Sequence, residues 1–248
     1  MHFVPHMPRQ EVARCIEAYP VAILPLGSTE QHGHHLPLGT DTLLAEDLAR
    51  RVSDQTGALV FPALPFGYSW VWRDIAGTVT LPQSPYKDTL VDLVRSIARH
   101  GIRLLVFING HEANNASIKY AIREAQDETD MKLLGMFYPG LAKTYAEHIE
   151  SETWGGMFHA CEFETSLMLA AHPDLVDIAL AQREYPERPP FYGMDNTSIG
   201  DLSQSGVYGD PQKATKEKGE AMFQAFTHTI VDLIATATQE LNLPATSL

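Results

Sequence analysis

The sequence has little of three features that mark large classes of proteins. Only two cysteines, Cys15 and Cys161, occur in 248 residues, which argues against a disulfide framework and fits a reducing cytoplasm. Lysine and arginine number 18 against 31 acidic residues, and the net charge of −13 disfavours nucleic acid and anionic membranes as partners. No apolar run approaches the roughly 20 residues of a membrane span, and the first residues lack a basic-then-apolar signal pattern. We therefore expect a cytoplasmic protein.

Short apolar runs alternate with stretches of helical periodicity. Strand-length runs lie at residues 21–26, 58–61, 104–108 and 133–137, and helical spacing is found at 40–52, 86–100 and 116–125. Thr40 or Asp41 is positioned to cap the first of these helices, and a long amphipathic helix is predicted from Pro211 to about Leu241. This alternation predicts an α/β fold whose mostly parallel sheet carries helices on both faces. The length fits one domain over residues 1–248.

Acidic and histidine side chains follow two of the predicted strands. Glu30 and His32 come after residues 21–26, with Asp41 close behind, and His111 follows residues 104–108. Ligands bind at the carboxyl ends of parallel strands, so these side chains are expected at one edge of the sheet. Residues two apart in an extended segment point to the same side, and Glu30 and His32 can therefore face one site. A third cluster, residues 159–162, supplies Glu162.

These five side chains predict a metal centre. With Asp41 shared, they suffice for two divalent cations about 3.5–4 Å apart. Mixed nitrogen and oxygen donors fit zinc, manganese or iron better than calcium or magnesium. Each residue alone is more often a solvated group, and Asp41 is also a good helix cap. The joint pattern, three clusters of which two follow strands, favours the metal site.

Several nearby residues keep more than one interpretation. His159 suits a general acid or base beside the metals, or a further ligand. Cys161 is expected to be a buried inert thiol, and Glu112 is either a solvated acid or part of the site. His34 and His35 are loop residues, one of which can orient a ligand. Residues 62–82 and 183–209 form two irregular stretches. Candidates for a substrate wall are Trp70, Trp72, Arg73 and Trp154, although such aromatic side chains equally suit a contact between subunits.

Three segments in this order resemble the creatininase family of metal-dependent amidohydrolases. They are Leu-Pro-Leu-Gly-Ser-Thr-Glu-Gln-His-Gly-His-His at residues 24–35 with Asp41, Asn-Gly-His at 109–111, and His-Ala-Cys-Glu-Phe-Glu-Thr-Ser at 159–166. The match runs from about Val21 to Gly219. No single segment is specific, but the combination is.

The resemblance implies a three-layer α/β/α sandwich with a binuclear zinc, manganese or iron site, zinc being the first choice, in a cytoplasmic homohexamer. It implies that Glu30 and His111 bind one metal, that His32 binds the other, and that Asp41 bridges them. His159 matches the catalytic histidine of the family, and Ser69 matches a serine at the substrate pocket.

Two departures separate this chain from creatininase itself. The position two residues after His111 is Ala113, where creatininase has a metal-binding glutamate, and Glu162 is inferred to take over that role. The pocket segment reads Val71-Trp72 where many relatives have Glu-His. We therefore expect a relative of creatininase that acts on another substrate.

The expected activity is hydrolysis of a small polar substrate, with cyclic compounds included. A metal-bound hydroxide attacks a carbonyl, an amide-type C–N bond breaks, and His159 moves a proton to the leaving group. One alternative is hydrolytic opening of a keto-inositol or keto-sugar at a C–C bond by the same site. A second alternative is a non-catalytic metal-binding oligomer.

Overall fold

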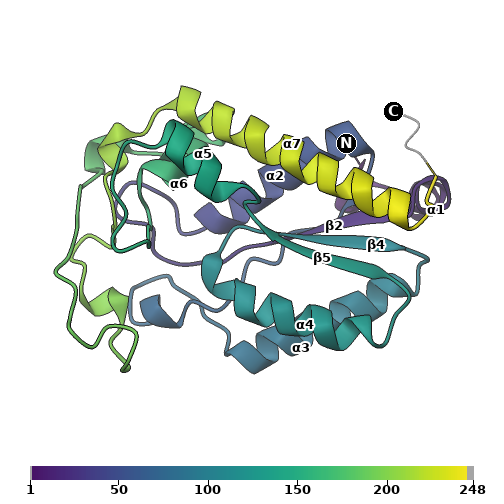
Figure 1. The fold of residues 1–248 in the computed structure, drawn as a ribbon, viewed down its shortest axis with the longest axis horizontal. Helices are drawn as coiled ribbons and strands as arrows, with labels where there is room; N and C mark the ends of the chain where they lie inside the picture. Colours follow the sequence, from purple (N-terminus) through teal and green to yellow (C-terminus); the bar gives the residue numbers. More distant parts are fainter. Residues whose placement is uncertain (1, 245–248) are drawn as a thin grey trace.

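The computed structural model describes residues 2–244 and has a five-stranded sheet at its centre (Figure 1). All neighbouring strands run parallel, in the order β1-β3-β2-β4-β5. The strands are β1 (His2–Phe3), β2 (Val21–Leu26), β3 (Leu59–Val60), β4 (Leu104–Asn109) and β5 (Lys132–Phe137). The predicted parallel α/β fold is confirmed.

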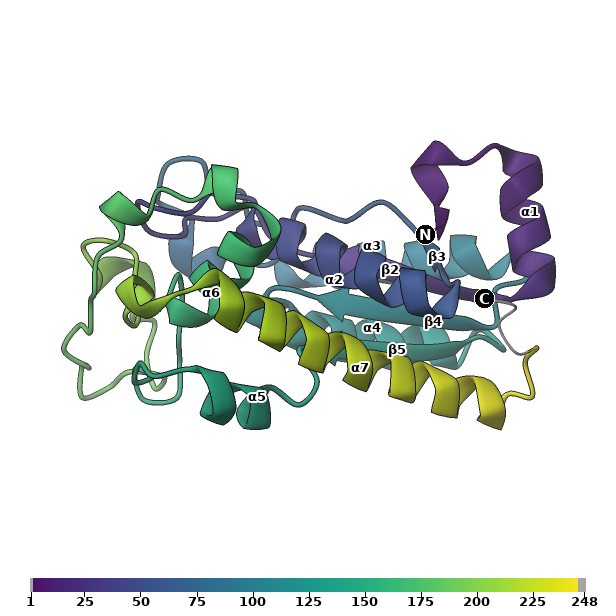
Figure 2. The ribbon, with the colours of Figure 1, turned by 90° about the horizontal axis from the view of Figure 1, so that it is seen from above.

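Helices cover both faces of this sheet (Figures 1 and 2). On one face lie α2 (Thr40–Thr56), α6 (Glu162–Ala171) and α7 (Lys216–Glu240), with α5 (Leu141–His148) packed on α7. On the other lie α3 (Gln83–Ala98) and α4 (Asn115–Gln126). The remaining helix, α1 (Arg9–Ala18), contacts β3 near the sheet edge. The result is a three-layer α/β/α sandwich.

Alternating side chains of β2 divide the core between the two layers. Val21 and Ile23 pack with the residues of α2 and α7, whereas Ala22 and Leu24 pack with those of α3 and α4. All six residues of β2 and of β4 are buried, as expected for strands covered on both faces.

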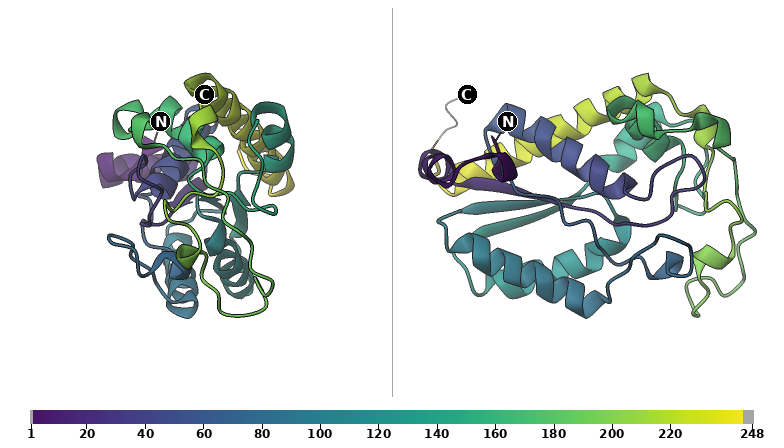
Figure 3. Two further views of the ribbon diagram at one scale, coloured as in Figure 1. Left: turned by 90° about the vertical axis from the view of Figure 1, so that its left-hand side faces the viewer. Right: turned by 180° about the vertical axis from the view of Figure 1, so that it is seen from behind.

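The register of the central strands determines where the site forms. Val21 of β2 pairs with Leu104 of β4, and Leu26 pairs with Asn109, so both strands end at the same level. The segments that follow them, which carry Glu30 and His111, are therefore neighbours. The irregular stretches 62–82 and 183–209 gather at this same end, on the left of Figure 1 and toward the viewer in the left panel of Figure 3.

Two predicted helix starts were wrong. Helix α2 is preceded by Gly39, so Thr40 and Asp41 lie inside its first turn and Asp41 is free to point elsewhere. Pro211 opens a short 3₁₀ turn, Pro211–Lys213, which the Asp210 side chain caps. The long C-terminal helix begins only at Lys216, because the Thr215 hydroxyl accepts a hydrogen bond from the Lys218 amide at 3.2 Å.

No helix within residues 2–244 is long and apolar enough to cross a membrane.

Helix α7 provides a test of the core. Phe226 is fully buried, with its ring 5.1 Å from Tyr138 and 6.0 Å from Phe163. We expect Phe226→Ala to lower the free energy of unfolding by about 3–5 kcal/mol, because it leaves a cavity. Leu233→Ala, at a 41% exposed position of the same helix, is the control and should cost well under half as much. Equal costs in urea unfolding would contradict the packing described.

Candidate metal centre

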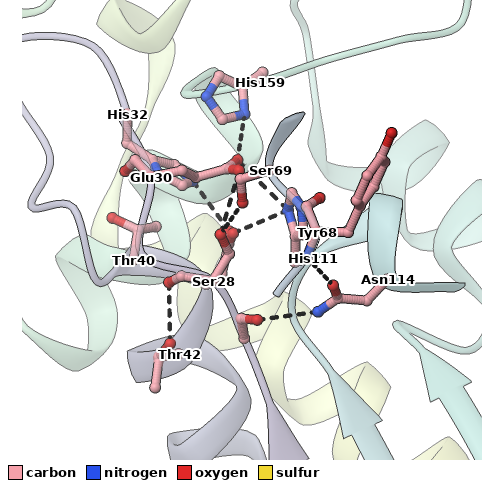
Figure 4. A network of polar contacts seen from close by, with 12 residues as sticks. Ser28, Glu30, His32, Thr40, Thr42, Tyr68, Ser69, His111, Asn114 and His159 are labelled. Atoms are coloured by element: carbon pink, nitrogen blue, oxygen red, sulfur yellow. Dashed lines mark hydrogen bonds and ion pairs between the residues drawn. The ribbon is translucent and has the colours of Figure 1, made fainter. Parts of the chain in front are cut away.

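Six buried side chains converge at the carboxyl edge of the sheet. Four of them, Glu30, His32, His111 and His159, are labelled in Figure 4. Glu30 and His32 come from the loop after β2, and Asp41 from the first turn of α2. His111 follows β4. His159 precedes α6, and Glu164 belongs to the first turn of that helix.

The donor atoms lie close enough to share cations. His32 Nε2 is 3.0 Å from Asp41 Oδ1 and 3.9 Å from Glu164 Oε1. His111 Nδ1 is 3.1 Å from Asp41 Oδ2 and 3.4 Å from Glu30 Oε1. Two sets of three donors, each with all its atoms within 4.8 Å of one another, share Asp41. These sets are Glu30, Asp41 and His111, and His32, Asp41 and Glu164.

Backbone carbonyls orient all three imidazoles. His32 Nδ1 donates to Glu30 O at 3.1 Å, His111 Nε2 to Tyr68 O at 2.9 Å, and His159 Nε2 to Gln31 O at 2.8 Å. A carbonyl oxygen can only accept, so these nitrogens carry the protons. The other nitrogen of each ring faces the carboxylates. Such outer hydrogen bonds are the usual partners of metal-binding histidines.

The buried carboxylates have oxygen atoms with few partners. Glu30 Oε1 and Asp41 Oδ2 are buried, and the only ion pairs that they form among residues 2–244 are with imidazole nitrogens. The other oxygen of Glu30, Oε2, accepts from the Ser28 hydroxyl at 3.3 Å, and Ser28 in turn bonds Ser69. Among residues 2–244, no lysine or arginine forms an ion pair with Glu30, Asp41 or Glu164. The donor set and its carboxylate oxygens therefore fit divalent cations, which would balance the buried negative charge.

The pKa values of the buried histidines and of Glu164 are shifted by burial and by the charges that gather at this site. Burial favours neutral forms, yet Asp41, Glu164 and Glu30 outweigh it and raise the pKa of His32 to about 10. For His111, burial is likewise outweighed by Glu30 and Asp41, and its pKa rises to about 9. Burial raises the pKa of Glu164 to about 7 against the pull of His32. When no metal cation is bound, protons on these groups balance part of the buried negative charge.

His159 differs from the other two histidines. Burial and the charge of His32 hold its pKa well below the usual range, so its ring is neutral. The ring stacks on Trp72 at 4.6 Å between centroids, and Nδ1 lies 3.8 Å from Glu30 Oε1. A neutral imidazole whose free nitrogen faces the centre is suited to accept a proton there.

Local backbone geometry brings these residues together. A side chain at Gly110 would lie 2.2 Å from the Asp41 carbonyl, so only glycine lets the chain before His111 pass this close to α2. Ala160 has a φ of 47°, in the left-handed region, where its amide donates to the Glu164 carboxylate. This uncommon conformation turns the chain between His159 and α6.

The prediction that Glu162 joins the centre was wrong. Its carboxylate is fully buried but accepts hydrogen bonds from the Glu150 and Ser151 amides, the latter at 2.7 Å, and pairs with Lys218 Nζ at 2.5 Å. Residues two apart on a helix point about 200° away from each other, so only one of Glu162 and Glu164 can face the centre. Glu164 does so, and Glu162 links α6 to α7.

A small cavity of about 90 Å³ opens onto the centre. Trp72 is the one predicted wall residue that lines this cavity. Four residues that were not predicted also line it, namely Val71, Met157, Phe158 and Ile199. The other predicted wall residues lie elsewhere. Ser69 is buried behind Glu30, Arg73 stacks on Trp70 at 3.8 Å and pairs with Asp74, and Trp154 packs against Tyr208. Sequence reasoning missed Met157 and Phe158, which have no distinguishing pattern.

The structure shows where the residues with more than one interpretation lie. Cys161 is buried and burial raises the pKa of its thiol, in line with an inert role. His34 is exposed, whereas His35 is buried and its Nε2 lies 2.9 Å from the Thr165 hydroxyl. Glu112 lines the cavity with an exposed side chain and is not one of the clustered donors.

Comparison with known proteins identifies the family. The family model described as creatinine amidohydrolase matches residues 5–234. Creatinine amidohydrolase of Pseudomonas putida is 34% identical over 229 residues, which are 86% of this chain and 88% of that protein. The mycofactocin precursor peptide peptidase of Mycobacterium ulcerans is 32% identical over 228 residues, covering 88% and 85%. The chain belongs to the creatininase family.

Solved structures of this family share the fold. A manganese form of creatininase superposes with a TM-score of 0.83 at 31% identity, covering 95% of this chain and 98% of that one. Another creatininase structure is described as a Zn-Zn type. Members of the creatininase family are metal-dependent amidohydrolases, and this chain is accordingly a hydrolase of that type.

The buried side chain of His35 should make the free energy of unfolding depend on pH. Burial, with the charges of His32 and His34, lowers its pKa to about 4, against about 6.5 in the unfolded chain. Because the unfolded state takes up the proton first, stability is lost as the pH falls from about 6.5 to 4, by about 3 kcal/mol in all.

Urea unfolding of the metal-free protein and of His35→Gln isolates this contribution. As the pH falls from 7 to 4, the variant should gain about 3 kcal/mol relative to the native sequence. Parallel pH profiles of the two proteins would contradict the lowered pKa of His35 in the folded state.

Proposed function

We propose that this creatininase-family protein hydrolyses an amide-type C–N bond of a small polar substrate with the help of two divalent cations. The observation that carries the proposal is the arrangement of three imidazoles, each with one nitrogen held by a backbone carbonyl and the other facing three buried carboxylates. The small cavity beside them supports a small substrate.

The proposed ligands form two overlapping sets. Glu30 and His111 would hold one cation, His32 and Glu164 the other, and Asp41 would bridge them. Zinc is the first choice because nitrogen and oxygen donors are mixed here, and manganese or iron suits the same donors. When bound, such cations activate water and polarise a substrate carbonyl.

His159 would transfer the proton that hydrolysis requires. Its Nδ1 is unprotonated at rest, because Nε2 donates to the Gln31 carbonyl. It would accept a proton from the attacking water and donate it to the leaving nitrogen as the C–N bond breaks. Trp72 and the Gln31 carbonyl keep the ring in one orientation and one tautomer throughout.

Amide cleavage is favoured over ring opening at a C–C bond. The two relatives described above are named an amidohydrolase and a peptidase, and both names denote hydrolysis of a C–N bond. No feature of the cavity favours a keto-inositol. The family resemblance also leads us to propose a homohexamer, which sedimentation or light scattering would test.

Metal content distinguishes the roles of the two glutamates in α6. We expect Glu164→Gln to lose at least one of two bound cations per chain, because it removes a charged ligand. Glu162→Gln is the matched control and should keep full stoichiometry, since its carboxylate faces Lys218. Elemental analysis after dialysis measures both, and loss of metal in the control alone would reverse the assignment.

His159→Asn tests the proton-transfer role. We expect kcat to fall by about 100-fold or more, on any amide that the native protein cleaves, while metal content stays unchanged. His34→Asn, an exposed neighbour of the site loop, is the control and should keep native kcat. Loss of a cation in His159→Asn would instead make His159 a ligand.

A further inference from the structure

Glu112 is the one carboxylate on the cavity wall that does not belong to the proposed metal ligands. The cavity is otherwise lined, apart from the donor cluster, by backbone and by uncharged side chains such as Trp72, Phe137, Met157 and Phe158. Glu112 directly follows His111 and begins the short 3₁₀ turn Glu112–Asn114. Its side chain is exposed, so Glu112 borders the cavity on the solvent side.

This carboxylate has no partner of its own. Among residues 2–244, no side chain donates a hydrogen bond to it and no cationic group forms an ion pair with it. The buried carboxylate Glu162 differs in this respect, because it pairs with Lys218. An unpaired negative charge at the mouth of a cavity attracts cations and repels anions.

The aromatic and thioether side chains of the cavity wall add to the preference for a cationic ligand. Flat, apolar faces next to a single carboxylate are the surroundings in which ammonium and guanidinium groups bind, through cation–π contact and a charge-assisted hydrogen bond. Two basic side chains at this end have other partners: Arg188 is exposed and stacks over Tyr192 and Trp154, at 5.0 and 5.6 Å, and Arg73 pairs with Asp74. Neither is among the residues that line the cavity.

We propose that Glu112 determines substrate specificity and selects amides that carry an ammonium or guanidinium group. The cationic group would contact Glu112 at the mouth, and the amide would lie deeper, against the donor cluster. The inference rests on the proposed amide hydrolysis for the statement that this cavity receives the substrate.

Binding of methylguanidinium and methylurea to the zinc-loaded protein tests the inference. The two probes have the same shape, and only the first is charged. Zinc loading is needed so that the buried carboxylates do not themselves attract the cation. Tryptophan fluorescence reports binding, because Trp72 lines the cavity. We expect the native protein to bind methylguanidinium about 10-fold more tightly than methylurea.

Two variants separate a local from a global effect of charge. Glu112→Gln should bring the affinity ratio close to one, with methylurea binding unchanged. Glu152→Gln removes an equal charge from an exposed position outside the cavity lining and should keep the native ratio. Equal affinities in the native protein, no measurable binding of either probe, or a ratio that survives Glu112→Gln would each overturn the inference.

Hydrolysis distinguishes this inference from the proposed function. A set of butyramides ending in ammonium, hydroxyl or carboxylate groups is offered to the same zinc-loaded proteins. Charge-selective binding without cleavage of any amide would leave the role of Glu112 intact and contradict amide hydrolysis. Cleavage of all three at equal kcat/KM would support the hydrolase and contradict selection by Glu112.

Discussion

The structure around the site depends on the burial of three carboxylates without a lysine or arginine to neutralise them. Glu30, Asp41 and Glu164 are held at the carboxyl edge of the sheet, and imidazoles are their only close cationic partners among the described residues. Such burial is unfavourable unless positive charge is supplied. In the absence of metal, protons supply it, as the raised pKa values of His32 and His111 indicate. Divalent cations would supply this positive charge in place of protons, and the imidazole nitrogens would then be free to bind the metal.

The rest of the fold keeps these groups in place. The paired ends of β2 and β4 bring two loops together, Gly110 lets the second loop pass close to α2, and the Glu162–Lys218 pair connects α6 to α7. The helical layers thereby provide rigidity, while the long loops at the same end supply the cavity walls. This division explains how relatives at about 30% identity share the fold and carry the names of different hydrolases.

Much of this arrangement could be predicted from residue patterns. The apolar run at residues 21–26 matches β2, and the helical periodicities at 86–100 and 116–125 lie over α3 and α4. The carboxyl ends of parallel strands lie at one edge of a sheet, so Glu30, His32 and His111 could be expected there, with Asp41 at the start of the helix that follows. The wall residues could not be predicted in this way, because loop conformation decides which aromatic faces a cavity. Trp70 and Trp72 lie in one short turn, yet only Trp72 reaches it.

Sequence by itself determined the fold class, the family and four of the proposed ligands, because strand periodicity and motif order are local properties of the chain. Tertiary structure alone decided between the two glutamates of α6. Both are acidic, both are buried and both stand in the first turn of the same helix. The rotation of that helix, set by Lys218 and by two backbone amides on one side, directs Glu164 to the other side and into the centre. That choice depends in part on Lys218, which lies 56 positions from Glu162 and so belongs to no local pattern.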